Sequence, residues 1–88
     1  MLVMGVDAGG TSSRAVLATA EGLVIGFGRG GSGNPTSSGI PIALSEVLRA
    51  IDDALDSGGA ALANVSRIVI AMAGHDARGG ASDWIFTP

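Results

Sequence analysis

The stretch Met4-Gly-Val-Asp-Ala-Gly-Gly-Thr-Ser-Ser-Arg-Ala-Val-Leu17 is the part of the sequence that indicates the fold most clearly. Apolar residues alternate with other residues on both sides of a glycine-rich bend, which predicts two strands joined as a β-hairpin over residues 5–17. Asp7 ends the first of these strands. The bend that follows contains two glycines and a hydroxyl: Gly9, Gly10 and Thr11.

These residues are suited to holding the phosphates of a nucleotide. Gly9 and Gly10 can adopt positive φ, which lets successive N–H groups converge on an anionic oxygen, and Thr11 adds a hydroxyl donor. Asp7 is placed to hold a hydrated Mg²⁺, because this ion prefers carboxylate oxygen and keeps several waters. The alternative is a simple tight turn with an ordinary carboxylate beside it, since short glycine-rich motifs are common.

The composition is that of one small domain without a basic surface. The chain has 88 residues and a formal net charge of -3. This balance provides no basic stripe for nucleic acid and no polybasic segment for anionic lipid. Hydrophobic residues make up 47% of the chain but aromatic residues only 3%, so we expect a core of Ala, Val, Ile and Leu.

The cysteine content and the apolar segments of the sequence indicate where in the cell the protein is located. The sequence contains no cysteine, which excludes a disulfide framework or a thiolate metal site in these residues. The N-terminus reaches Asp7 without a positively charged segment, unlike a signal peptide. No apolar run approaches the roughly 20 residues of a transmembrane helix. We therefore expect a cytoplasmic protein with no membrane segment.

A third strand is expected over residues 23–27, which would complete an antiparallel meander with glycines that suit an edge strand. Residues 29–39 have no periodicity and predict a loop of about ten residues, long enough to suggest a function. Asn34 stands out in this loop, because its amide can both donate to and accept from a polyhydroxylated ligand. Pro35 restricts its backbone. Ordinary turn chemistry is the alternative.

Residues 40–57 follow the period of a helix that ends at Gly58-Gly59. One stripe of this helix is apolar and is expected to face the core: Ile40, Leu44, Val47, Leu48, Ile51 and Leu55. Three carboxylates opposite the stripe predict a solvated face: Asp52, Asp53 and Asp56. Arg49 and Asp53 have the i, i+4 spacing of a surface ion pair.

The apolar run over residues 67–74 is typical of a parallel strand buried on both faces. The order strand, helix, strand implies a right-handed crossover, and the simplest parallel partner is the first strand. The run ends in small residues, where Gly74 would let a ligand approach. His75 and Asp76 follow at the strand end; a catalytic role and an ordinary surface position are both open.

The last residues predict the start of another helix. Ser82 or Asp83 could cap it, and Trp84 and Ile85 would be its first core contacts.

The predicted order of three strands, a helix and a strand (β-β-β-α-β) resembles the amino-terminal half-domain of the sugar kinase, heat-shock-70 and actin superfamily. That fold is α/β and ribonuclease H-like (actin-like ATPase). More narrowly, the chain is similar to the BadF/BadG/BcrA/BcrD-type ATPase family, which includes N-acetylglucosamine kinases. Three segments carry the resemblance in order along the chain: Gly5–Arg14, Gly33-Asn34-Pro35 and Ile70–Gly74. Residues 1–88 are thus interpreted as a partial amino-terminal ATPase or sugar kinase domain.

The resemblance implies ATP and Mg²⁺ as cofactors and an amino sugar such as N-acetylglucosamine as substrate, hence a transferase of carbohydrate metabolism. Asp7 would position Mg²⁺ through water. Asn34 would bind the sugar, and Gly74 would lie near the cleft. The ATP phosphates would contact three residues: Gly9, Gly10 and Thr11. The family's catalytic base is expected beyond Pro88, and the full-length form could be a homodimer.

Two other functions stay open. The first is an ATPase activator of a 2-hydroxyacyl-CoA dehydratase, another branch of the family, which needs cysteines for an iron–sulfur cluster. The second is a non-catalytic remnant, favoured by the short length. Without the fifth strand and covering helices of the parent sheet, the 88 residues are expected to fold poorly or to associate on their own.

Overall fold

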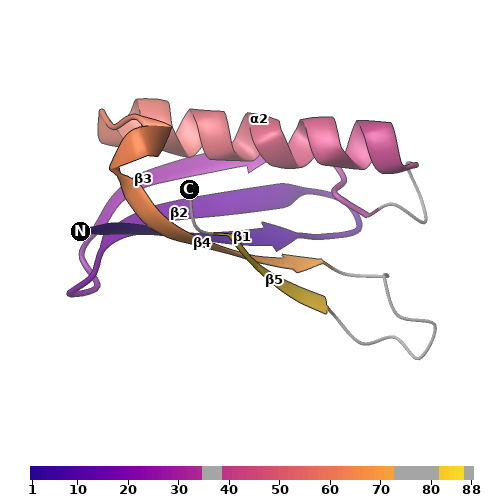
Figure 1. Cartoon of the computed structure of the whole chain (residues 1–88). Helices are drawn as coiled ribbons and strands as arrows, with labels where there is room; N and C mark the ends of the chain where they lie inside the picture. The colour runs from indigo at the N-terminus through magenta and orange to yellow at the C-terminus, as the bar shows by residue number, and fades with distance from the viewer. Residues whose placement is uncertain (35–38, 73–81, 87–88) are drawn as a thin grey trace.

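The computed structural model describes residues 1–34, 39–72 and 82–86. Its elements in chain order are β1 (Leu2–Ala8), β2 (Ser13–Thr19), β3 (Val24–Gly30), α2 (Ile40–Gly58), the 3-10 turn η1 (Leu62–Asn64), β4 (Val65–Met72) and β5 (Ser82–Phe86). The strands form one mixed sheet in the order β3-β2-β1-β4-β5. The helix α2 lies along one face of this sheet, over β3 and β2 (Figure 1).

The first three strands form the predicted antiparallel meander. β1 pairs with β2 from Leu2↔Thr19 to Ala8↔Ser13, so that residues 9–12 close the hairpin. β2 pairs with β3, which is an edge strand as its glycines indicated. β4 runs parallel to β1, as the strand, helix, strand order predicted.

The core lies between α2 and the sheet, and its side chains are small to medium in size. Alternate strand residues face the helix, because successive side chains of a strand point to opposite faces. The sheet contributes Met4, Val6, Ala8, Ala15, Leu17, Ile68 and Ile70. The helix contributes Ala43, Val47, Ala50, Ile51, Ala54 and Leu55.

The buried face of α2 differs from the predicted stripe. Three residues expected in the core are at least half exposed: Ile40, Leu44 and Leu48. Alanines take their place, and the reason is the strand below. Gly28 faces the helix, and a Cβ added there would overlap the carbonyl oxygen of Ala50. A helix this close to a strand leaves room at the contact only for alanine-sized side chains.

Side chains of α2 also cover the free edge of β3. Three backbone N–H groups of the strand and its end donate to the helix: Phe27 to Ser57 Oγ (3.1 Å), Arg29 to Asp53 Oδ2 (3.1 Å) and Gly31 to Glu46 Oε1 (2.8 Å). An edge strand left with unpaired N–H groups is a template for association with another chain. The helix therefore closes this edge of the sheet.

This arrangement confirms one prediction for the helix surface and corrects another. Asp52, Asp53 and Asp56 are exposed, as predicted. Asp53 was also predicted to pair with Arg49, but its carboxylate accepts a hydrogen bond from the backbone of Arg29. Arg49 pairs with Glu46 instead, with 3.6 Å between Nε and Oε1. The helix period does not show that β3 lies beside α2. The backbone N–H groups of this edge strand determine which carboxylate of the helix acts as their acceptor.

The ends of α2 agree with the prediction to within one residue. Gly59 has a φ of 65°, and its N–H donates to the carbonyls of Leu55 and Asp56. Glycine adopts this left-handed conformation without the penalty that a Cβ imposes. Within the described ranges, no helix combines the length and apolarity needed to cross a membrane.

Three strand predictions need correction. β3 continues to Gly30, so the first two residues of the predicted loop 29–39 belong to the strand. β4 starts at Val65, two residues earlier than predicted, and the last two residues of the predicted strand, 73 and 74, lie outside the described residues. It is also not buried on both faces, because Val69 and Ala71 are partly exposed on the face away from the helix.

The predicted helix start at Ser82 is wrong. Residues Ser82–Phe86 form β5, which pairs antiparallel with β4 from Met72↔Ser82 to Ile68↔Phe86. The 88 residues thus contain a fifth strand, which extends the sheet beyond β4. Aromatic and β-branched residues favour strands. The open edge of β4 also offers backbone hydrogen bonds to this segment, and they stabilise a strand more than a capping residue stabilises a helix start.

The edge closure can be tested with two neighbouring aspartates. Asp53→Ala should speed amide hydrogen exchange at Arg29 about three- to tenfold, because one hydrogen bond of modest net strength is lost. Asp52→Ala is the matched control, since Asp52 is exposed on the same helix. It should leave that rate unchanged. Equal effects of the two substitutions, measured by NMR, would contradict the contact.

Candidate active site

The hairpin between β1 and β2 is held by a tight backbone contact. The N–H of Gly9 donates to the carbonyl of Ser12 at 2.9 Å. A Cβ at Gly9 would come within 2.8 Å of that same oxygen, so a larger residue would force the turn open. Neither Gly9 nor Gly10 uses the positive φ that glycine can adopt. Position 9 requires glycine because a Cβ would collide with the carbonyl of Ser12, and not because the backbone is left-handed there.

Hydrogen-bonding groups at the tip of the hairpin are open. Within the described part of the chain, the N–H groups of Gly10 and Thr11 have no partner. Both residues are exposed, and Asp7 is exposed at the end of β1. Two adjacent N–H donors, a hydroxyl and a carboxylate thus lie at one end of the sheet. This set can accept anionic oxygens and a hydrated divalent cation.

The loop after β3 is tied to this hairpin through Gly33. Its N–H donates to the carbonyl of Gly9 at 3.1 Å. Gly33 is buried, and a Cβ there would meet Ser13 Oγ at 2.6 Å and Ala8 Cβ at 2.8 Å. Val47 of α2 closes the third side, with Cγ2 at 3.0 Å from the same position. Only glycine lets the loop reach the strand ends so closely.

Asn34 is consequently held beside the hairpin. Its backbone N–H donates to Ser32 Oγ at 3.3 Å. Its side-chain Nδ2 lies 4.0 Å from the place that a Cβ on Gly10 would occupy. The residue predicted to bind the sugar and a residue predicted to contact phosphate are therefore neighbours, although 24 positions separate them in the sequence.

Ser13 is a residue of this region that sequence reasoning missed. Its side chain is fully buried, and within the described residues Oγ has no hydrogen-bond partner. Burying an unpaired hydroxyl costs about 1–3 kcal/mol in protein contexts. The sequence gives no signal for this residue, because its place as the first inward position of β2 is known only from the burial pattern of the strand.

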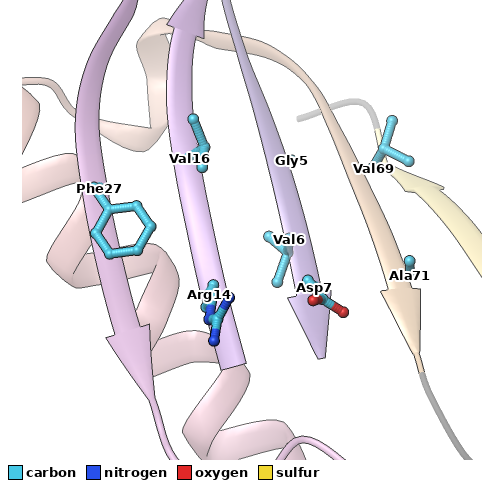
Figure 2. A pocket seen from close by; sticks show the side chains of 8 residues that line it. All are labelled: Gly5, Val6, Asp7, Arg14, Val16, Phe27, Val69 and Ala71. Carbon is cyan, nitrogen blue, oxygen red and sulfur yellow. The ribbon is translucent and has the colours of Figure 1, made fainter. Parts of the chain in front are cut away.

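Asp7 and Arg14 lie on the opposite face of the sheet from α2. They are directly paired across β1 and β2. Figure 2 shows them together near the hairpin end of an open hollow. The lining residues of this hollow are Gly5, Val6, Asp7, Arg14, Val16, Phe27, Val69 and Ala71. Sequence reasoning gave Arg14 no role, although a four-residue hairpin loop after Ala8 already places it opposite Asp7.

Some predicted positions are not part of this description. Gly74, His75 and Asp76 lie outside the described residues. Asp83 belongs to β5, where its Cα pairs with Ala71. Within the described ranges, no group of three potential metal ligands occurs.

Comparison with known proteins gives this arrangement a family. An α/β half-domain with a glycine-rich hairpin between its first two strands is the actin-like, ribonuclease H-like type. The chain belongs to the BadF/BadG/BcrA/BcrD ATPase family, whose model matches residues 4–87. No curated protein sequence matches the chain significantly.

A solved structure supports the same assignment. The chain is similar to a Chromobacterium violaceum protein assigned as an N-acetylglucosamine kinase, with a TM-score of 0.69 and 25% sequence identity. The match covers 88% of this chain and 27% of that protein, so the chain spans about a quarter of its length. The predicted family and fold class are confirmed.

The contact between loop and hairpin can be tested at two glycines of the same loop. Gly33→Ala should destabilise the protein by about 1–3 kcal/mol, because the added carbon meets strand and helix atoms that cannot move independently. Gly31→Ala is the control: its Cβ would touch only the end of the Glu46 side chain, at 3.1 Å or more. Urea denaturation of the two variants should separate them. Similar midpoints would contradict the docking of the loop.

Proposed function

We propose that this chain supplies the phosphate-binding hairpin and part of the sugar-binding loop of an ATP-dependent kinase that acts on an amino sugar such as N-acetylglucosamine. Residues 1–88 would then be an amino-terminal portion of the kinase domain. The single observation that carries the proposal is the contact between Gly33 and Gly9, 3.1 Å from N to O, which brings Asn34 beside Gly10.

Each group at the hairpin has a role in this proposal. The N–H groups of Gly10 and Thr11 would donate to phosphate oxygens of ATP, because two neighbouring donors suit a tetrahedral anion. Asp7 would hold Mg²⁺ through water, and the bound ion would neutralise charge on the phosphates. Arg14 is paired with Asp7 across the two strands, and its positive charge would also help to neutralise the phosphates.

The amide of Asn34 would orient the sugar. An amide can donate to one hydroxyl and accept from another, which fixes a polyhydroxylated ring in one direction. Transfer then forms a bond from a sugar hydroxyl oxygen to the γ-phosphorus and breaks the bond to the bridging oxygen of ADP. Positioning and charge stabilisation provide most of the catalysis in such reactions. The base that takes the hydroxyl proton is not among the described residues.

The alternative of a dehydratase activator receives no support from these residues. Its iron–sulfur cluster needs thiolate ligands, and the 88 residues contain no cysteine. Homodimer formation stays a prediction from the resemblance, and a cytoplasmic location stays a prediction from the composition of the sequence.

The proposal is tested by assaying ADP release from Mg-ATP with N-acetylglucosamine, using the complete protein that carries this sequence. Asp7→Asn should lower kcat about 100-fold or more, because the lost carboxylate weakens metal placement. Asn34→Ala should instead raise the KM for the sugar about tenfold, with the KM for ATP unchanged. Sugar-independent turnover in the wild type, or an Asn34 defect confined to ATP, would contradict the proposal.

A further inference from the structure

The buried hydroxyl of Ser13 is the polar group of this region that the proposed function leaves unused. Its side chain is 0% exposed, and Oγ has no partner within the described residues. Buried polar groups in native proteins are nearly always hydrogen-bonded, so an exception indicates strain, a bound water or a role in another state. The surroundings of Ser13 favour the third explanation.

Ser13 lies beneath the loop that carries Asn34. Its Oγ is 2.6 Å from the position of a Cβ on Gly33, so the hydroxyl fills the space directly against that residue. Ala8 Cβ and Val47 Cγ2 occupy the other sides at 2.8 and 3.0 Å from the same point. The neighbours from strand and helix are apolar. The loop backbone at Gly33 also packs against this hydroxyl, and its carbonyl groups are hydrogen-bond acceptors.

We propose that Ser13 is a positioning residue for the amino sugar. In the sugar-bound state, the Ser13 hydroxyl donates to a backbone carbonyl of residues 31–34 and fixes the loop with the Asn34 amide beside Gly10. This inference rests on the proposed function, since it concerns how that function's sugar site is completed. The hydrogen bond forms when the loop settles on the sugar, and the free protein carries the hydroxyl unpaired.

The arrangement makes stability and sugar affinity respond in opposite directions. Removing an unpaired buried hydroxyl relieves its desolvation cost in the free protein. Removing the same hydroxyl from the bound state deletes a hydrogen bond there. A hydroxyl that merely supports the fold would not separate these two effects, because its loss would weaken the free protein as well.

The test compares Ser13→Ala with Ser66→Ala in the complete protein. Ser66 is an exposed serine of β4 and serves as the control. Ser13→Ala should keep or raise the urea midpoint of the unliganded protein. It should raise the KM for N-acetylglucosamine about three- to tenfold, the value of one hydrogen bond, with kcat and the KM for ATP within twofold. Ser13→Cys, which keeps a weak donor of similar size, should lie between wild type and Ser13→Ala.

Two results would overturn the inference while leaving the proposed function intact. One is an unchanged sugar KM in Ser13→Ala. The other is a lowered urea midpoint together with equal rises in the KM for sugar and for ATP, which would show a purely structural residue. A wild-type protein that does not phosphorylate or bind the sugar would instead overturn the proposed function, and this inference with it.

Discussion

The structure depends on how closely α2 approaches the edge strand β3. Three strand glycines face the helix, each against one carbonyl oxygen: Gly26 with Ala54, Gly28 with Ala50, and Gly30 with Glu46. Two residues of a strand span about 6.6 Å, and four residues of a helix span about 6 Å. The spacing between glycines at every second strand position is therefore about equal to the spacing between carbonyl groups at every fourth helix position. As a result, the contact between helix and strand extends from Gly26 to Gly30. Between the glycines, the strand's outward N–H groups meet acceptors on the helix.

The candidate site follows from this contact. Once α2 lies on β3, Glu46 accepts from the first residue after the strand, and Val47 is placed against Gly33. The loop is thereby directed onto the hairpin, where Gly33 reaches Gly9 and Asn34 reaches Gly10. The phosphate-binding and sugar-binding groups proposed for this protein meet because α2 packs closely against β3, whose residues at the contact are glycines.

The sequence predicts the backbone frame better than the contacts that position the site. The alternation of apolar residues around the glycine bend was enough to predict the hairpin. The helix period was enough to predict the ends of α2, and the order of the elements was enough to predict the parallel partner of β4. Periodicity failed for the buried face of α2, because hydrophobicity favours Leu44 and Leu48 while the glycines opposite accept only alanine-sized neighbours. The sequence-based prediction also failed for Ser82–Phe86, because this segment forms a strand by pairing with the open edge of β4. The role of Asn34 came from resemblance; its neighbour Ser13 carries no motif and is visible only once burial is known.

The most direct test of this account is the urea midpoint of Gly28→Ala against that of Gly5→Ala. Both glycines are in the sheet and neither has a positive φ. A Cβ at Gly5 would meet nothing within 4 Å, whereas one at Gly28 would overlap the backbone of α2. We expect a loss of about 3 kcal/mol for Gly28→Ala and a change within about 0.5 kcal/mol for Gly5→Ala. Equal midpoints would show that α2 does not pack against the glycines of β3 and therefore does not position the candidate site.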